Sequence, residues 1–178
     1  MQLMISEITF ENQFDFGRCD MSFSVDSRLV LFAEDGKIRY TVREVAPPYI
    51  KNYGPRRTDY AEYGNATDRM IFLAYVDNDI AGEVSITTSW NKYALLDAFV
   101  VDPKFRRKGV GRALIFRCIE WAKEKGLRGV TLETQDINVP ACLLYASCGF
   151  QLRGFDTHLY KALHPDTTEI ALYWYLML

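Results

Sequence analysis

The sequence predicts an α/β domain of the α+β type, in which strands outnumber two helices. Short β-branched runs separated by turn signals indicate strands in the first half of the chain. Apolar residues recur at helical spacing from 109 to 125, and a shorter helix is predicted from Asn138 to Tyr145. At 178 residues the chain has the length of one domain, which we expect to occupy residues 27–178.

The N-terminal region is predicted to contain a leader and then a β-hairpin. Residues 1–26 are rich in Phe and Asp and weakly patterned, so we expect a partly mobile leader there. Asp35-Gly36 lies between two β-prone runs, residues 28–32 and 37–45. Because Asp-Gly favours the tight turn of a hairpin, these runs are predicted to pair.

Pro47-Pro48 predicts the end of that strand, followed by a short helix at residues 49–53. Residues 54–67 are polar and interrupted by glycine and proline, which predicts a loop. A second hairpin is predicted from residues 70–76 and 80–88, around an Asp-Asn-Asp turn.

The most informative stretch combines a strand, a basic loop and the start of a helix. Residues 95–101 form an apolar run that ends at Asp102-Pro103, because proline offers no donor to a sheet. Arg106-x-x-Gly109-x-Gly111 follows and opens directly into the helix that ends at Gly126. Unpaired amides and the helix dipole make such a loop suitable for phosphate, whereas the plainer alternative is a basic surface loop.

Other phosphate-binding motifs do not fit this loop. The dinucleotide fingerprint requires a third glycine where this chain has Leu114, and no Gly-Lys-Ser/Thr ending of a P-loop is present. Beyond it, residues 130–133 predict a strand, and Asn138 and Pro140 suit the first turn of the second helix. Residues 149–153 and 170–178 are predicted to be the closing strands.

Composition excludes several classes of protein. A net charge of −2 does not suit a nucleic-acid-binding protein, so the cations of the loop are a local feature. Four cysteines without Cys-x-x-Cys spacing and two histidines do not suggest a metal site. The sequence shows no run of transmembrane length and no signal-peptide pattern near its start, so we expect a reduced, cytoplasmic protein without a membrane partner.

The motifs Arg106-x-x-Gly109-x-Gly111 and Asn138-x-x-Ala141-x-x-x-Tyr145, followed by Gly149-Phe150, resemble the two signatures of the GNAT superfamily of N-acetyltransferases. This resemblance implies the GNAT fold, a mixed central sheet of about seven strands flanked by helices, with acetyl-CoA as cofactor and no metal. It places the cofactor on Phe99, Val100, Val101, Arg106, Arg107, Lys108, Gly109, Val110, Gly111, Arg112, Asn138, Ala141 and Tyr145.

Further segments, among them Trp90-Asn-Lys-Tyr93 and Asp156-Thr-His-Leu-Tyr160, resemble the streptothricin acetyltransferases of that superfamily. The resemblance implies acetylation of the β-lysine moiety of a streptothricin-type antibiotic, a small polycationic amine. Two alternatives stay open, which are acetylation of another amine, such as a protein or a polyamine, and a non-catalytic acyl-CoA-binding module. A homodimer also stays open as the assembly.

Amine acetylation needs a group that protonates the leaving thiolate and one that removes the proton of the amine. The second signature makes Tyr145 the candidate general acid, with simple helix packing as the alternative. Three acids interrupt apolar strands, where an unpaired carboxylate is costly, namely Glu83, Asp97 and Glu133. We select Asp97 and Glu133 as catalytic candidates. The acceptor is predicted to contact Glu83, Trp90, Tyr93, Asp97, Glu133 and Asp136, although Glu83 also suits a solvent-facing position and both aromatic residues suit a core.

Overall fold

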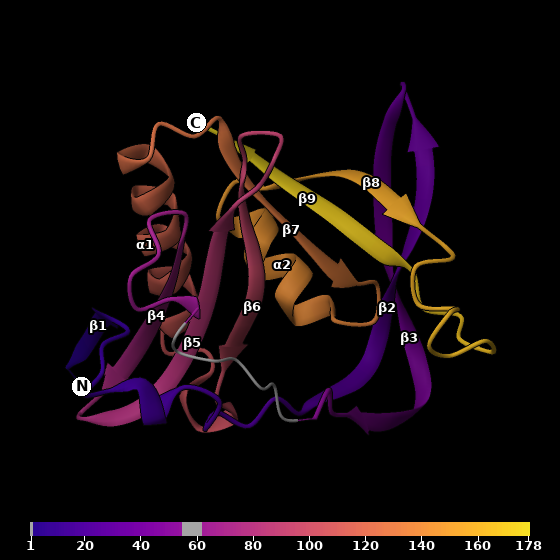
Figure 1. The fold of residues 1–178 in the computed structure, drawn as a ribbon. Helices are drawn as coiled ribbons and strands as arrows, with labels where there is room; N and C mark the ends of the chain where they lie inside the picture. Colours follow the sequence, from indigo (N-terminus) through magenta and orange to yellow (C-terminus); the bar gives the residue numbers. More distant parts are fainter. Residues whose placement is uncertain (1, 55–61) are drawn as a thin grey trace. The chain divides into compact units, whose positions relative to one another are not determined.

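The computed structural model describes residues 2–54 and 62–178, so residues 55–61 of the predicted polar loop lie outside the described chain. Its main elements follow one another as β1 (Leu3–Glu7), β2 (Phe23–Glu34), β3 (Lys37–Lys51), β4 (Arg69–Val76), β5 (Asp79–Thr88), β6 (Ala94–Val101), α1 (Val110–Glu124), β7 (Gly129–Gln135), α2 (Val139–Ser147), β8 (Gln151–Asp156) and β9 (Ala171–Met177) (Figure 1). Two short 3-10 turns, η1 (Gln13–Asp15) and η3 (Pro103–Phe105), precede β2 and α1.

The predicted mixed sheet of seven strands is confirmed, but its membership differs from the expectation. The strands are ordered β1-β4-β5-β6-β7-β9-β8, whereas β2 and β3 form a separate two-stranded sheet. The edge place beside β4 belongs to β1, which pairs from Leu3 opposite Val76 to Glu7 opposite Phe72. Residues 1–26, expected to be a leader, therefore include a strand of the main sheet.

The β2–β3 hairpin is confirmed, and its turn is formed by Asp35 and Gly36, which both have positive φ. The helix expected at residues 49–53 is wrong, because β3 continues to Lys51. Residues 45–48, which include both prolines, lie opposite Asp26 where the pairing register shifts. Proline is tolerated there because a bulge leaves residues out of the ladder.

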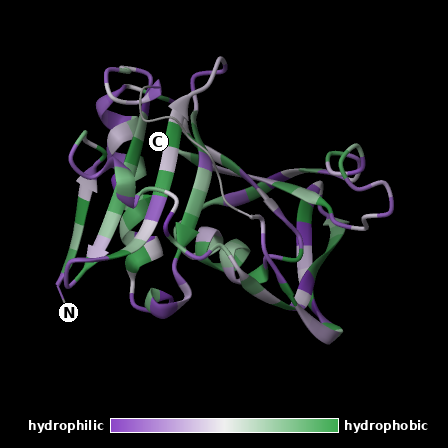
Figure 2. Cartoon of the chain, turned by 60° about the horizontal axis from the view of Figure 1, so that its bottom comes forward, coloured by the Kyte–Doolittle hydropathy of each residue, from purple (hydrophilic) through white to green (hydrophobic). Residues whose placement is uncertain are grey.

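The chain divides into two compact units, of which the first comprises Met1–Ser22, Asn52–Val130 and Met177–Leu178. Within it, α1 packs against β1, β4, β5 and β6 through buried residues such as Leu114 and Cys118. A Cβ atom on Gly82 would lie 2.9 Å from the Val100 carbonyl oxygen and 3.0 Å from Leu114, so glycine permits this close approach. Figure 2 shows hydrophobic residues interspersed with hydrophilic ones along the strands.

The second unit comprises Phe23–Lys51 and Thr131–Leu176. Here α2 contacts β2 and β8, and β8 pairs antiparallel with β9. Phe23 and Val25, at the start of β2, form a small core cluster with Ile137. The helix expected from Asn138 to Tyr145 is confirmed, since α2 begins directly after Asn138, whose side chain accepts a hydrogen bond from the Ala141 amide at 3.4 Å.

Candidate functional site

The loop between β6 and α1 changes the direction of the chain within a few residues. Asp102 ends the strand, and its side chain accepts a hydrogen bond from the Lys104 amide at 3.0 Å, which caps η3. Arg107 and Gly109 then adopt positive φ values of 64° and 86°. Gly109 is the N-cap of α1, and within the described chain no side chain caps this helix end. The loop therefore delivers an uncapped helix N-terminus.

This helix N-terminus has the properties of a phosphate site. The Ala113 amide donates to the Gly109 carbonyl at 3.1 Å, which is the first hydrogen bond of the helix ladder. The amides of Val110, Gly111 and Arg112 lie in the turn before this bond and so do not belong to the ladder. A Cβ atom on Gly109 would meet no described atom within 4 Å, so the space above the loop is open. Amides, dipole and open space together fit the diphosphate of coenzyme A.

Arg106 differs from the other cations in and after this loop. Arg107, Lys108 and Arg112 are exposed, with the Lys108 ammonium 5.2 Å from the centre of the Phe105 ring. Arg106 is half-buried, and its guanidinium donates to the carbonyl oxygens of Val101 at 2.9 Å and Ser22 at 2.6 Å. The Arg106 side chain is thus engaged with backbone carbonyls, and its expected contact with the cofactor stays a prediction.

Asp97 occupies an irregular place in β6. Ser85 pairs with Ala98 and Ile86 pairs with Leu96, so Asp97 is the extra residue of a β-bulge. Its side chain is exposed, and the neighbouring Ala98 amide donates to the Ser85 hydroxyl at 3.1 Å. Bulges often occur beside active sites because they redirect one side chain. Farther along β6, Phe99 and Val101 are half-buried and Val100 is buried.

The remaining first-unit candidates have different environments. Glu83 is 2% exposed, and its carboxylate accepts the Gly17 amide at 2.8 Å, so the alternative of a solvent-facing glutamate is wrong. Trp90 is 91% exposed in the turn before β6, which excludes a core position for this residue. Tyr93 is half-buried and donates its hydroxyl to the Met177 sulfur at 3.3 Å. Of these residues, Trp90 is the one most available to a ligand.

Tyr145 lies in a packed aromatic group of the second unit. Its side chain is on α2 and 5% exposed, with ring centroids 6.0 Å from Phe150 and 6.4 Å from Trp174. The Trp174 ring in turn contacts Tyr40 of β3 edge-on at 6.0 Å. Tyr145 is therefore a packed helical tyrosine, as the alternative interpretation expected. The same packing holds its ring in a fixed orientation, as a general acid requires.

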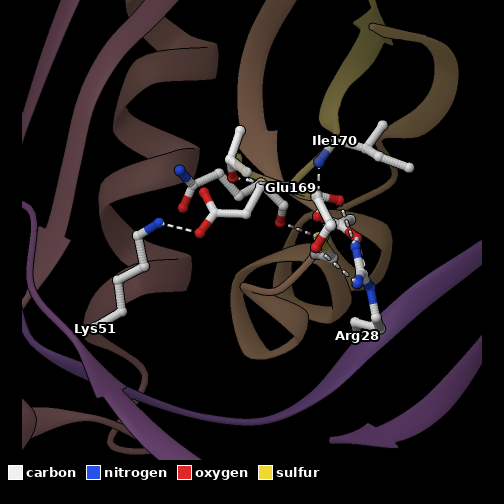
Figure 3. A network of polar contacts seen from close by, with 9 residues as sticks. Arg28, Lys51, Glu169 and Ile170 are labelled. Atoms are coloured by element: carbon white, nitrogen blue, oxygen red, sulfur yellow. Dashed lines mark hydrogen bonds and ion pairs between the residues drawn. The ribbon is translucent and has the colours of Figure 1, made fainter. Parts of the chain in front are cut away.

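Asp136 is the centre of a buried polar network. Its fully buried carboxylate accepts Arg28 through Nε at 2.9 Å and Nη2 at 2.5 Å, and the Ile170 amide at 2.9 Å (Figure 3). A second ion pair, Lys51 with Glu169, lies in the same view. These partners argue against the expected contact of Asp136 with an acceptor. Sequence reasoning missed Arg28, because no local signal links residues so far apart in the chain.

Glu133 is exposed on β7 and receives a hydrogen bond from the phenol of Tyr160, which lies in the loop between β8 and β9. Burial, followed by the charges of Asp156 and Glu133, raises the pKa of Tyr173 on β9. The Glu133 carboxylate thus interacts with two phenols of this unit, those of Tyr160 and Tyr173. Tyr160 was not among the predicted site residues, although its segment contributed to the resemblance.

Two further findings concern the residues that the structure covers. Across 2–54 and 62–178, no group of three or more His, Cys, Asp or Glu side chains is arranged to hold a metal ion. None of the helices in these ranges has the length and hydropathy needed to cross a bilayer.

A family model described as the acetyltransferase (GNAT) family matches residues 39–150, which include α2 and the loop from Asp102 to Gly109, here called the phosphate loop. The chain belongs to the GNAT acetyltransferase family. Streptothricin acetyltransferase A of Bacillus subtilis (strain 168) is 39% identical over 172 residues, which are 97% of this chain and 98% of that protein.

Two solved acetyltransferase structures agree with this assignment. A Bacillus anthracis protein assigned as a streptothricin acetyltransferase, solved with acetyl coenzyme A, has a TM-score of 0.92 and 40% identity over 99% of this chain and all of its own. A nourseothricin acetyltransferase has a TM-score of 0.83 and 30% identity over 99% of each chain.

Proposed function

We propose that this chain is an acetyl-CoA-dependent N-acetyltransferase that inactivates streptothricin-type antibiotics by acetylating an amine of their β-lysine moiety. The observation that carries the proposal is the open, uncapped N-terminus of α1 at Gly109 and its exposed cations. It occurs in a chain that is 39% identical to a streptothricin acetyltransferase over 97% of its length. The four cysteines are free, which suits a reducing compartment, and we place the enzyme in the cytoplasm.

Each candidate residue receives a separate role. The amides of Val110, Gly111 and Arg112 would hold the diphosphate of the cofactor, which supplies the activated acetyl group. Asp97, or a water that it orients, would take the proton of the bound ammonium before attack, since its bulge presents an exposed carboxylate. Tyr145 would protonate the leaving thiolate. In this proposal Glu133, supported by Tyr160, attracts the cationic acceptor.

The proposal is tested by measuring thiol release from acetyl-CoA with and without streptothricin, and by mass spectrometry of the antibiotic. We expect streptothricin-dependent thiol release and the addition of one acetyl group on the β-lysine moiety. A polyamine and a peptide with a free N-terminus serve as competing acceptors. Turnover with one of these but not with streptothricin would overturn the substrate. Binding of acetyl-CoA without turnover of any acceptor would instead favour a non-catalytic module.

The carboxylates are tested by two matched amide substitutions. Asp97→Asn should lower kcat about 10²–10⁴-fold, the usual range for loss of general acid–base catalysis, because it keeps the size of the side chain but removes the base. Glu133→Gln should mainly raise KM for the acceptor, with an effect that weakens at high salt. Wild-type kinetics in both variants would show that other groups recognise and deprotonate the amine.

A further inference from the structure

We infer that Arg106 is a positioning residue, and that it joins the N-terminal segment Asp15–Ser22, here called the strap, to the phosphate loop so that the loop is held ready for acetyl-CoA. The inference rests on the proposed function, because it concerns the loop assigned to the cofactor. It gives residues 15–22 a role that the sequence did not indicate, as a support of the cofactor site.

Arg106 links three segments of the first unit. Its Nε donates to the carbonyl of Val101, the last residue of β6, at 2.9 Å. Its Nη2 donates to the carbonyl of Ser22, the last residue of the strap, at 2.6 Å. The guanidinium is rigid and planar, so these two bonds hold the loop against both the strand and the strap. Burial lowers the pKa of the Arg106 guanidinium, in keeping with a side chain turned away from water.

Two further hydrogen bonds hold the strap. Asp102 accepts the Lys104 amide through Oδ1 and the Asp20 amide through Oδ2 at 3.2 Å, so one carboxylate binds the loop and the strap together. The buried carboxylate of Glu83 on β5 accepts the Gly17 amide at 2.8 Å. Both carboxylates therefore accept hydrogen bonds from backbone amides of the strap, which is held at Gly17, Asp20 and Ser22.

Cys19 provides a natural reporter of this arrangement. It is buried within the strap, and desolvation, with the charges of Glu83 and Asp102, raises the pKa of its thiol to about 12. It should therefore react with an alkylating agent only when the strap opens. Cys118 is buried in α1 of the same unit and reports wider unfolding.

The first experiment uses the wild-type protein and peptide-resolved mass spectrometry of alkylation, with and without saturating acetyl-CoA. We expect Cys19 to react faster than Cys118, and acetyl-CoA to slow Cys19 about tenfold or more, because coupling between two equilibria is reciprocal. Equal rates at both cysteines, or a Cys19 rate that acetyl-CoA does not change, would overturn the inference.

The second experiment compares Arg106→Gln with Arg107→Gln by calorimetric titration of acetyl-CoA at low and high salt. The first substitution should weaken binding about tenfold at both salt concentrations and accelerate alkylation of Cys19 while Cys118 is unchanged. The second should cause a smaller loss that disappears at high salt, as expected of an exposed charge. If the Arg106→Gln loss also disappears at high salt, Arg106 is a phosphate ligand and the inference is wrong.

Arg106→Lys should not restore binding, since an ammonium cannot replace the fork of the guanidinium. Full restoration by lysine would contradict the positioning role. Neither experiment requires an acceptor, so failure of this inference is distinguishable from failure of the proposed substrate. If Arg106→Gln does not fold, the alkylation experiment on the wild-type protein still decides the question.

Discussion

Replacing Arg28 by methionine is expected to destabilise the protein by about 3–5 kcal/mol, the usual cost of leaving one partner of a buried ion pair without the other. The carboxylate of Asp136 is 0% exposed, and within the described residues Arg28 supplies two of the three hydrogen bonds that it accepts. In the variant a full negative charge would remain buried with the Ile170 amide as its partner. For a chain of this size about 2–4 °C of Tm corresponds to 1 kcal/mol, so Tm should fall by about 6–20 °C.

Thermal unfolding followed by circular dichroism measures this loss. Arg39→Met is a matched control on the same hairpin, because Arg39 and Glu34 are 50% and 58% exposed and 3.5 Å apart. The control should lose less than about 1 kcal/mol. The double variant Arg28→Met/Asp136→Asn should recover much of the loss, since the amide oxygen still accepts from Ile170 and no charge is buried. If Arg28→Met melts within about 1 °C of the wild type, the buried pair does not stabilise the fold.

Three more outcomes are expected. Gly109→Val should weaken acetyl-CoA binding more than Arg107→Ala in calorimetry, because a side chain is strained at φ 86° and enters the open space, whereas one exposed cation is partly redundant. Equal affinities would contradict this. Tyr145→Phe should lower kcat about 10²–10⁴-fold and leave acetyl-CoA affinity nearly unchanged, and full turnover with chemistry rate-limiting would remove its role as acid. In the native protein Cys148 should be alkylated before Cys142, because burial raises the pKa of the Cys142 thiol to about 12. A mass-spectrometric time course measures the order, and the reverse order would refute the assigned burial.

Local signals in the sequence predicted most elements of the second half of the chain. The helix after Gly109 and its end near Gly126 follow from apolar spacing and from a residue with positive φ after the last turn. The strand end predicted at Pro47-Pro48 is wrong, because proline ends a strand only where the ladder needs its amide. Here the prolines occupy an interruption in pairing that depends on the opposite strand.

The sequence by itself determined the family, the glycine-bearing loop before α1 and the two helices, because each depends on residues that are neighbours along the chain. Tertiary structure alone showed which groups the charged side chains contact. Asp136 looked like an acceptor ligand until Arg28, 108 residues away, was seen to pair with it. Arg106 was predicted to bind the cofactor from its place in the motif, and only the structure shows that its guanidinium donates to the Ser22 carbonyl. The role of a charged side chain depends on the groups that neutralise or solvate it, and folding brings those partners from distant parts of the sequence.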